Sequence, residues 1–179
     1  MSDLDVRPLE VAHHEALRAF FERVPEGDRT FFREDVLAPG VIQGWSSGAP
    51  GERFVAVLGD DVVGYLALIP EVGWSSHVGE LRVVVDPGRR RSGVGRALAR
   101  HGFLQGLERG LTKLIVEVVA DQEPTLAMFS ALGFEPEALL RDHVRDAAGE
   151  FRDLIVMAHF VEAVWETMRT VGIDEAVEA

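Results

Sequence analysis

The residues best suited to bind a ligand lie between Val83 and Arg100, in the stretch VVVDPGRRRSGVGRALAR. An apolar run ends at Asp86-Pro87, and glycines, arginines and the pattern of a helix follow at once. The first amides of a helix lack acceptors within it, and its dipole adds partial positive charge there. Glycines let a ligand approach the backbone, and arginines add formal charge. The stretch predicts a phosphate-binding turn; a surface turn with solvated arginines is the alternative.

Two common nucleotide-binding patterns do not fit this turn. A nucleotide P-loop needs Gly-Lys-Ser/Thr, which the stretch lacks. A dinucleotide fingerprint needs a third small residue where Leu98 stands, and it normally opens a series of parallel strands. Antiparallel strands are expected before this turn, so the turn alone leaves the kind of phosphate open.

A second segment completes a more specific pattern. Residues 90–95, RRSGVG, match Arg/Gln-x-x-Gly-x-Gly/Ala, the pyrophosphate loop of the GNAT superfamily of N-acetyltransferases, and follow a run like that family's fourth strand. At the expected distance, QEPTLAMFSALGF (122–134) is similar to the family's Asn-x-x-Ala-x-x-Leu-Tyr-x-x-x-Gly-Phe segment. The resemblance covers most of the chain. It implies a GNAT-like fold that uses acetyl-CoA, or another short acyl-CoA, as co-substrate without a metal.

The resemblance assigns cofactor contacts to three places in the chain. The backbone amides of the glycine turn would hold the pyrophosphate, and the backbone of the preceding strand would pair with the pantetheine arm. Gln122 stands at the family's Asn position and could hydrogen-bond the pantetheine, and Phe129 would pack beside the cofactor. The predicted cofactor-binding residues are Val83, Val85, Arg90, Arg91, Ser92, Gly93, Val94, Gly95, Arg96, Gln122 and Phe129.

Acyl transfer to an amine requires the neutral amine. A lysine-like amine has a pKa of about 10.4, so only about one molecule in 10³ is neutral at pH 7, and a positioned base accelerates the reaction. Glu80 lies at the start of the central strand, where similar enzymes often carry a Glu that acts directly or through water; a structural or exposed carboxylate is the alternative. His77 is the second candidate base, although its loop is equally typical of a surface histidine.

The leaving thiolate lacks the family's usual proton donor. That donor is often the Tyr of Leu-Tyr-x-x-x-Gly-Phe, but Met128-Phe129 stand there, and Phe129 has no proton to give. A thiol pKa of about 8.5 makes the thiolate a tolerable leaving group, and water or Ser130 could protonate it. Tyr65, the sole tyrosine, is expected to pack in the core. Because this tyrosine is missing, a second hypothesis stays open: an acyl-CoA-binding or sensing module without turnover.

Weaker signals come from other polar and aromatic side chains. His143 and Asp153 could line the acceptor pocket, although a hairpin that is polar on both faces is more often a solvated edge or a dimer contact. Trp45 and Trp74 could border the acceptor cleft or pack in the core. The sequence contains no Cys and no Ser/His/Asp arrangement, so the enzyme hypothesis is direct transfer in a ternary complex.

The elements that must position these residues follow from periodicity and turn signals. They predict an α+β fold, with a mixed, mostly antiparallel central sheet of about six to seven strands flanked by helices. In the helix after the glycine turn, the predicted buried stripe is Val94, Ala97, Leu98, His101, Leu104 and Leu107. The expected elements are a strand in 5–11, helices at 12–24 and from Asp28 to about Val36, a hairpin at 53–69, a strand at 80–86, a helix to Arg109, a strand at 113–120, a helix at 124–132, a hairpin at 139–160 and a terminal helix from 161.

The length, composition and net charge limit the classes of protein to which the chain can belong. The 179 residues, 47% hydrophobic, suit one domain over 1–179, with about 160–179 as a helical extension. No run approaches the ~20 apolar residues of a membrane helix, and we expect a cytoplasmic protein without membrane contact. The net charge of -12 argues against nucleic acid and slightly favours a cationic acceptor, either a small-molecule amine or a protein amine. A homodimer is possible, and the sequence leaves the acceptor and the acyl length open.

Overall fold

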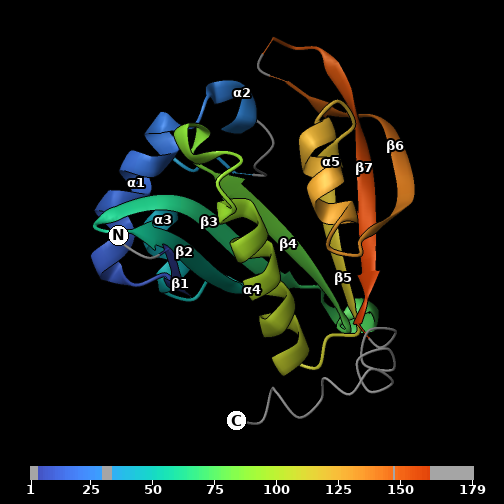
Figure 1. The fold of residues 1–179 in the computed structure, drawn as a ribbon, viewed down its shortest axis with the longest axis horizontal. Coiled ribbons are helices and arrows are strands. Elements are labelled where there is room, and N and C mark those ends of the chain that lie inside the picture. The colour runs from blue at the N-terminus through green and yellow to red at the C-terminus, as the bar shows by residue number, and fades with distance from the viewer. Residues whose placement is uncertain (1–3, 30–33, 147, 162–179) are drawn as a thin grey trace.

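A computed structural model describes residues 4–29, 34–146 and 148–161. Within these residues the chain forms one seven-stranded sheet with the order β1-β2-β3-β4-β5-β7-β6 (Figure 1). Strands β4 and β5 are parallel, and the other neighbouring pairs are antiparallel, which confirms the predicted mixed sheet. The strands are β1 (Leu4–Pro8), β2 (Glu52–Leu58), β3 (Asp61–Pro70), β4 (Val78–Val85), β5 (Lys113–Val119), β6 (Glu135–Arg145) and β7 (Phe151–Phe160).

Helices cover both faces of this sheet. On one face α1 and α3 pack against alternate residues of the early strands, among them Val55 and Tyr65. On the other face α4 packs against the intervening residues, such as Leu66 and Leu81. The alternation of strand side chains therefore divides the molecule into two apolar cores. The helices are α1 (His14–Arg23), α2 (Glu26–Arg29), α3 (Val41–Ser46), α4 (Val94–Glu108) and α5 (Glu123–Ser130), with short 3-10 turns η1 (Val11–His13), η2 (Gly73–Ser75) and η3 (Pro87–Arg89).

The buried face of α4 differs from the predicted stripe. Leu104 was expected in the core but is 43% exposed, whereas Gly102 and Gly106 are buried. A Cβ at Gly102 would lie 2.8 Å from a methyl group of Leu81, and one at Gly106 would lie 2.9 Å from a methyl group of Leu114. The two glycines thus bring α4 close to the sheet and rotate Leu104 outward. A pattern counted from large apolar residues misses such a face.

Two further expectations about helices change. Asp28 does not cap a second helix but lies inside α2, because the chain already turns at Pro25, whose carbonyl accepts from the amides of Asp28 and Arg29. The short helix α3 was not predicted. The expected terminal helix from residue 161 falls almost entirely outside the described residues. Of the helix predicted from Asp28 to about Val36, residues 30–33 are not described, and residues 34–36 are not helical.

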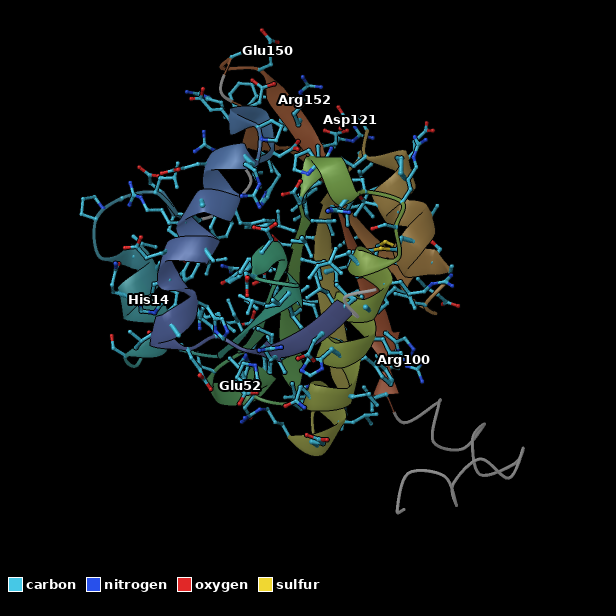
Figure 2. The ribbon with its side chains drawn as sticks, turned by 60° about the vertical axis from the view of Figure 1, so that its left-hand side comes forward. His14, Glu52, Arg100, Asp121, Glu150 and Arg152 are labelled. Carbon is cyan, nitrogen blue, oxygen red and sulfur yellow. The ribbon has the colours of Figure 1, made fainter. Side chains whose placement is uncertain are left out.

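Hydrogen bonds of polar side chains hold the β6–β7 hairpin in place. Asp146 accepts from the amides of Ala148 and Glu150, both at 2.9 Å, and closes the turn. Arg152 donates to Asp121 at 2.8 Å, and Figure 2 shows both side chains at the same end of the sheet. In the described part of the chain, no helix combines the length and apolar character of a membrane span.

Candidate active site

Strands β4 and β5 are paired over only a short stretch. Their register runs from Val78 opposite Lys113 to Glu80 opposite Ile115, yet β4 continues to Val85. On its other edge, β5 pairs with β7 along its whole length, from Lys113 to Val119. Figure 1 shows the two strands side by side at their start and separated farther along. Among the described residues, the second half of β4 therefore has a strand neighbour on one edge, β3, and none on the edge that faces β5.

The backbone direction of β4 shows which groups face this unpaired edge. The amide of Asp86 donates to the Val63 carbonyl at 2.9 Å, and the β3–β4 register has no irregularity. In an antiparallel pair, alternate residues point their backbone groups toward the partner. Counting back from Asp86, the backbone groups of Leu81, Val83 and Val85 point away from β3 and toward the gap.

The glycine turn leads directly from this edge into α4. Arg91 and Gly93 both have positive φ angles, 63° and 89°, and Gly93 is the N-cap of the helix. The first hydrogen bond into the helix runs from the Ala97 amide to the Gly93 carbonyl. The amides just before Ala97 therefore have no acceptor within the helix and form a donor surface at its positive end.

Gly95 sits where the turn meets α5. A Cβ at Gly95 would lie 2.9 Å from the Met128 Sδ and 3.4 Å from a methyl group of Val85, so α4, α5 and β4 converge at this residue. At Gly93, by contrast, a Cβ would meet nothing within 4 Å. The φ angle at Gly93 thus favours glycine, and a side chain at Gly95 would have to displace Met128.

An ion pair ties the start of the turn to α1. The carboxylate of Asp86 accepts from the Gly88 amide at 2.9 Å and from the Arg23 Nε at 2.8 Å. Arg90 is paired with Asp28, and the Ser92 hydroxyl donates to the Arg89 carbonyl at 2.5 Å. These contacts fix the path of the chain between β4 and α4.

Glu80 is buried at the last residue at which β4 and β5 pair. Its side chain is only 7% exposed, and Arg82 donates to both carboxylate oxygens: Nε to Oε1 at 2.8 Å and Nη2 to Oε2 at 2.9 Å. Because the two residues are two apart on one strand, their side chains leave the same face. This is the face covered by α1 and α3, since Val84, the next residue in the alternation, packs in that core.

Arg82 lies among several ionisable groups. Its hydrogen bond to Glu80 is the largest influence that raises its pKa above the ordinary value, and the charges of Glu80 and Glu117 act in the same direction against partial burial. Arg82 therefore stays cationic. Glu117 comes from β5, across the gap, so this polar group spans the two strands that separate.

The other predicted catalytic residue lies away from Glu80. His77 is exposed in the turn before β4, and its backbone carbonyl accepts from the Thr112 amide at 3.0 Å. Three residues of extended chain separate His77 from Glu80, a distance of about 10 Å. His77 therefore lies beyond the paired end of the strands, on the side opposite to the gap.

The residues predicted from the α5 segment have different environments. Phe129 is buried and packs edge-on against Phe134 with ring centroids 5.3 Å apart. Gln122 precedes α5 as its N-cap and is partly exposed, and Ser130 is exposed at the helix end. Gln122 therefore lies at the N-terminal end of α5, just after β5.

The candidate acceptor residues outside this region mostly have structural contacts. Trp45 is buried and stacks on Tyr65 with centroids 5.0 Å apart, whereas Trp74 is fully exposed. The Asp153 carboxylate accepts from the Asp142 amide at 2.9 Å within the hairpin, and His143 is exposed. Burial raises the pKa of Tyr65 well above its ordinary value, so its phenol stays protonated.

Three residues of the region were missed by the sequence analysis. Arg82 could have been found, because period two on the predicted strand already places it on the same face as Glu80. Glu117 is the single charged residue inside an apolar strand, which is also a visible signal. Arg23 is 63 residues from Asp86 in sequence, and nothing local indicates that contact.

Comparison with known proteins identifies the family. The model of the acetyltransferase (GNAT) family matches residues 10–134, a segment that contains the glycine turn, β4, β5 and α5. The chain belongs to the GNAT family. The match confirms the resemblance drawn from the two motifs, and it includes the buried Glu80–Arg82 pair.

Relatives in the GNAT family carry several named activities. A [ribosomal protein bS18]-alanine N-acetyltransferase of Escherichia coli strain K12 is 34% identical over 76 residues, 42% of this chain and 51% of the relative. The aligned part thus spans about half of that relative's length. A streptothricin acetyltransferase of Streptomyces lavendulae is 33% identical over 127 residues, 64% of this chain and 67% of the relative.

Solved GNAT structures share the fold. A GCN5-related N-acetyltransferase from Kribbella flavida superimposes with a TM-score of 0.73 at 25% identity, covering 88% of this chain and 97% of that chain. The agreement over nearly the whole of that structure confirms the predicted fold class.

Proposed function

We propose that this chain is an N-acetyltransferase that moves the acetyl group of acetyl-CoA to a primary amine by direct transfer. The observation that carries the proposal is the continuity of the unpaired edge of β4 with the glycine turn. A ligand with an amide-bearing arm and a pyrophosphate matches both parts, because the arm can add to the strand edge and the phosphates can accept from the helix amides.

The cofactor residues fit this ligand. The backbone groups of Val83 and Val85 would pair with the pantetheine arm, and the amides from Arg91 to Arg96 would hold the pyrophosphate. At Gly93 a Cβ would meet nothing within 4 Å, so its absence leaves the backbone open to a ligand. Arg96 is exposed beside this surface and adds positive charge. Gln122 would reach the arm from the start of α5.

The protein groups near the gap account for the transfer. Bound acetyl-CoA supplies the acetyl thioester. The Glu80 carboxylate takes a proton from the acceptor ammonium, directly or through one water. The neutral nitrogen then attacks the acetyl carbon, the carbon–sulfur bond breaks, and the second proton lost by the nitrogen passes to solvent. Sulfur leaves with the electron pair as the thiolate, and Arg82 keeps its protons. A base of this kind contributes about 10²–10⁴-fold to the rate.

The thiolate leaves without a tyrosine donor. Phe129 occupies the usual position and is buried, and Tyr65 packs against Phe21 and Trp45 on the α1 side of the sheet. A thiol pKa of about 8.5 makes the thiolate a tolerable leaving group, and water protonates it after it departs. The loss of the tyrosine affects the leaving group and leaves the base intact.

The relatives indicate the class of acceptor. The named activities above act on a protein alanine and on streptothricin, and amines are common to both. The net charge of -12 favours an acceptor that arrives as a cation. We infer a primary amine on a small molecule or a protein; the homodimer and the cytoplasmic location stay predictions.

A panel assay tests the proposal. Purified protein is mixed with acetyl-CoA and, in turn, peptides beginning with alanine, lysine peptides, polyamines and aminoglycosides, and free thiol is measured. We expect thiol release that depends on one class of amine. Binding of CoA without thiol release on any amine would favour the sensing module instead.

A further inference from the structure

Arg82 touches the proposed base but has no role of its own in the transfer described above. We propose that Arg82 is a positioning residue, which holds the Glu80 carboxylate in one orientation for proton transfer from the acceptor amine. This inference rests on the proposed function and adds a second residue to the proton-transfer step.

The geometry of the pair supports orientation. Two parallel contacts of 2.8 and 2.9 Å join the guanidinium edge to both carboxylate oxygens. A planar guanidinium that binds two oxygens fixes the plane of the carboxylate, which a single ammonium contact cannot do. A carboxylate offers about four lone-pair sites, and the two contacts with Arg82 use two of them. The bidentate contact with Arg82 therefore does not by itself exhaust the acceptor capacity of Glu80.

The burial and the position of the Glu80–Arg82 ion pair indicate a role beyond the stability of the fold. The side chains of Glu80 and Arg82 are 7% and 22% exposed, and desolvation of two charges offsets most of what their attraction contributes to folding. Apolar residues could fill the same volume at no such cost. The pair lies where β4 loses its β5 neighbour, which is where the acetyl group of a ligand on the open edge would come close to the sheet.

The surrounding groups keep the Arg82 guanidinium cationic. The hydrogen bond to Glu80 raises the pKa of Arg82 most, and the charge of Glu117 on β5 acts in the same direction. The guanidinium is thus a constant partner while Glu80 gains and loses a proton.

The test separates proton transfer from mere packing by changing the acceptor. Arg82→Met and Arg82→Lys are compared with wild type, using ethylamine and trifluoroethylamine near neutral pH. Ethylamine is almost entirely protonated there, whereas the fluorinated amine is largely neutral and needs no deprotonation before attack. We expect Arg82→Met to lower kcat for ethylamine roughly 10–100-fold, with Arg82→Lys intermediate. The loss for trifluoroethylamine should be much smaller, and KM for acetyl-CoA should not change.

Two further variants make each outcome decisive. Arg100→Met removes an equal charge from an exposed position on α4 (Figure 2) and should behave as wild type. Glu80→Gln/Arg82→Met should be no slower than Glu80→Gln alone, because Arg82 acts through Glu80; this variant carries the test if Arg82→Met does not fold. Equal losses with both amines, or losses that multiply in the double variant, would overturn the inference. Wild-type inactivity on every amine would contradict the proposed function instead.

Discussion

The backbone amide of Asp86 donates to the carbonyl of Val63 at 2.9 Å, and this bond fixes which residues of β4 face the gap beside β5. If a cofactor adds to that edge, the amides that gain protection from hydrogen exchange are those of Val83 and Val85. Val84 already faces β3 and should show little change. The measurement is residue-resolved exchange with and without CoA; protection of Val84 in place of its neighbours would contradict the proposed register.

Gly93 is expected to be sensitive to side-chain shape because of its backbone conformation. Its φ of +89° strains a β-branched residue by about 1–2 kcal/mol, whereas Asn tolerates the left-handed region. Gly93→Val should therefore lose most of the thermal stabilisation that CoA gives to the wild type, and Gly93→Asn should keep a large part of it. Full stabilisation of Gly93→Val by CoA would show that the pyrophosphate does not bind at this turn.

Gly95 is expected to be sensitive for a different reason, its contact with α5. A Cβ would lie 2.9 Å from the Met128 Sδ, so Gly95→Ala must displace Met128 or the turn. We predict that Gly95→Ala weakens CoA binding by roughly tenfold and that Gly95→Ala/Met128→Ala recovers most of the loss. Calorimetric titration with CoA measures both. Failure of the second substitution to restore affinity would rule out this contact as the cause.

The sequence predicts most of the fold and part of the site. The apolar run that ends at Val85, and the glycine turn after it, are local patterns, and both lie where they were expected. The short helix α3 and the buried glycine face of α4 were missed, because neither has a large apolar repeat. The contact between Arg23 and Asp86 depends on packing of distant elements, which no local pattern records.

Glu80→Gln tests the base. The substitution keeps the size but removes proton affinity and one of the two acceptor oxygens that Arg82 binds, so kcat should fall by roughly 10²-fold or more. The deficit should grow as pH falls, because fewer acceptor amines are then neutral. Glu71→Gln, in the exposed loop before β4, is the matched control and should retain the wild-type rate. An unaltered pH–rate profile in Glu80→Gln would remove Glu80 as the base.

The burial of His159 predicts how the stability of the fold depends on pH. It is buried between Phe103 and Phe134, at centroid distances of 4.8 and 5.3 Å, and burial lowers its pKa. The unfolded chain, with a histidine pKa of about 6.5, then binds more protons than the folded chain below that pH, so stability falls on acidification. Burial of His101 acts in the same direction.

A single substitution isolates this effect. His159→Phe keeps an aromatic ring between the same two neighbours and removes the titrating group. The fall in Tm between neutral and mildly acidic buffer should be smaller in His159→Phe than in the wild type. An identical fall in both proteins would contradict the assignment.

Mass spectrometry of one reaction mixture tests the central claim most directly. Wild-type protein, acetyl-CoA and the most reactive amine of the panel are followed together, and acetylated amine, CoA thiol and intact protein are quantified. Direct N-acetyl transfer predicts acetylated amine and thiol in equal amounts, with the protein mass unchanged. Bound CoA without acetylated amine, or an acetyl group left on the protein, would contradict it.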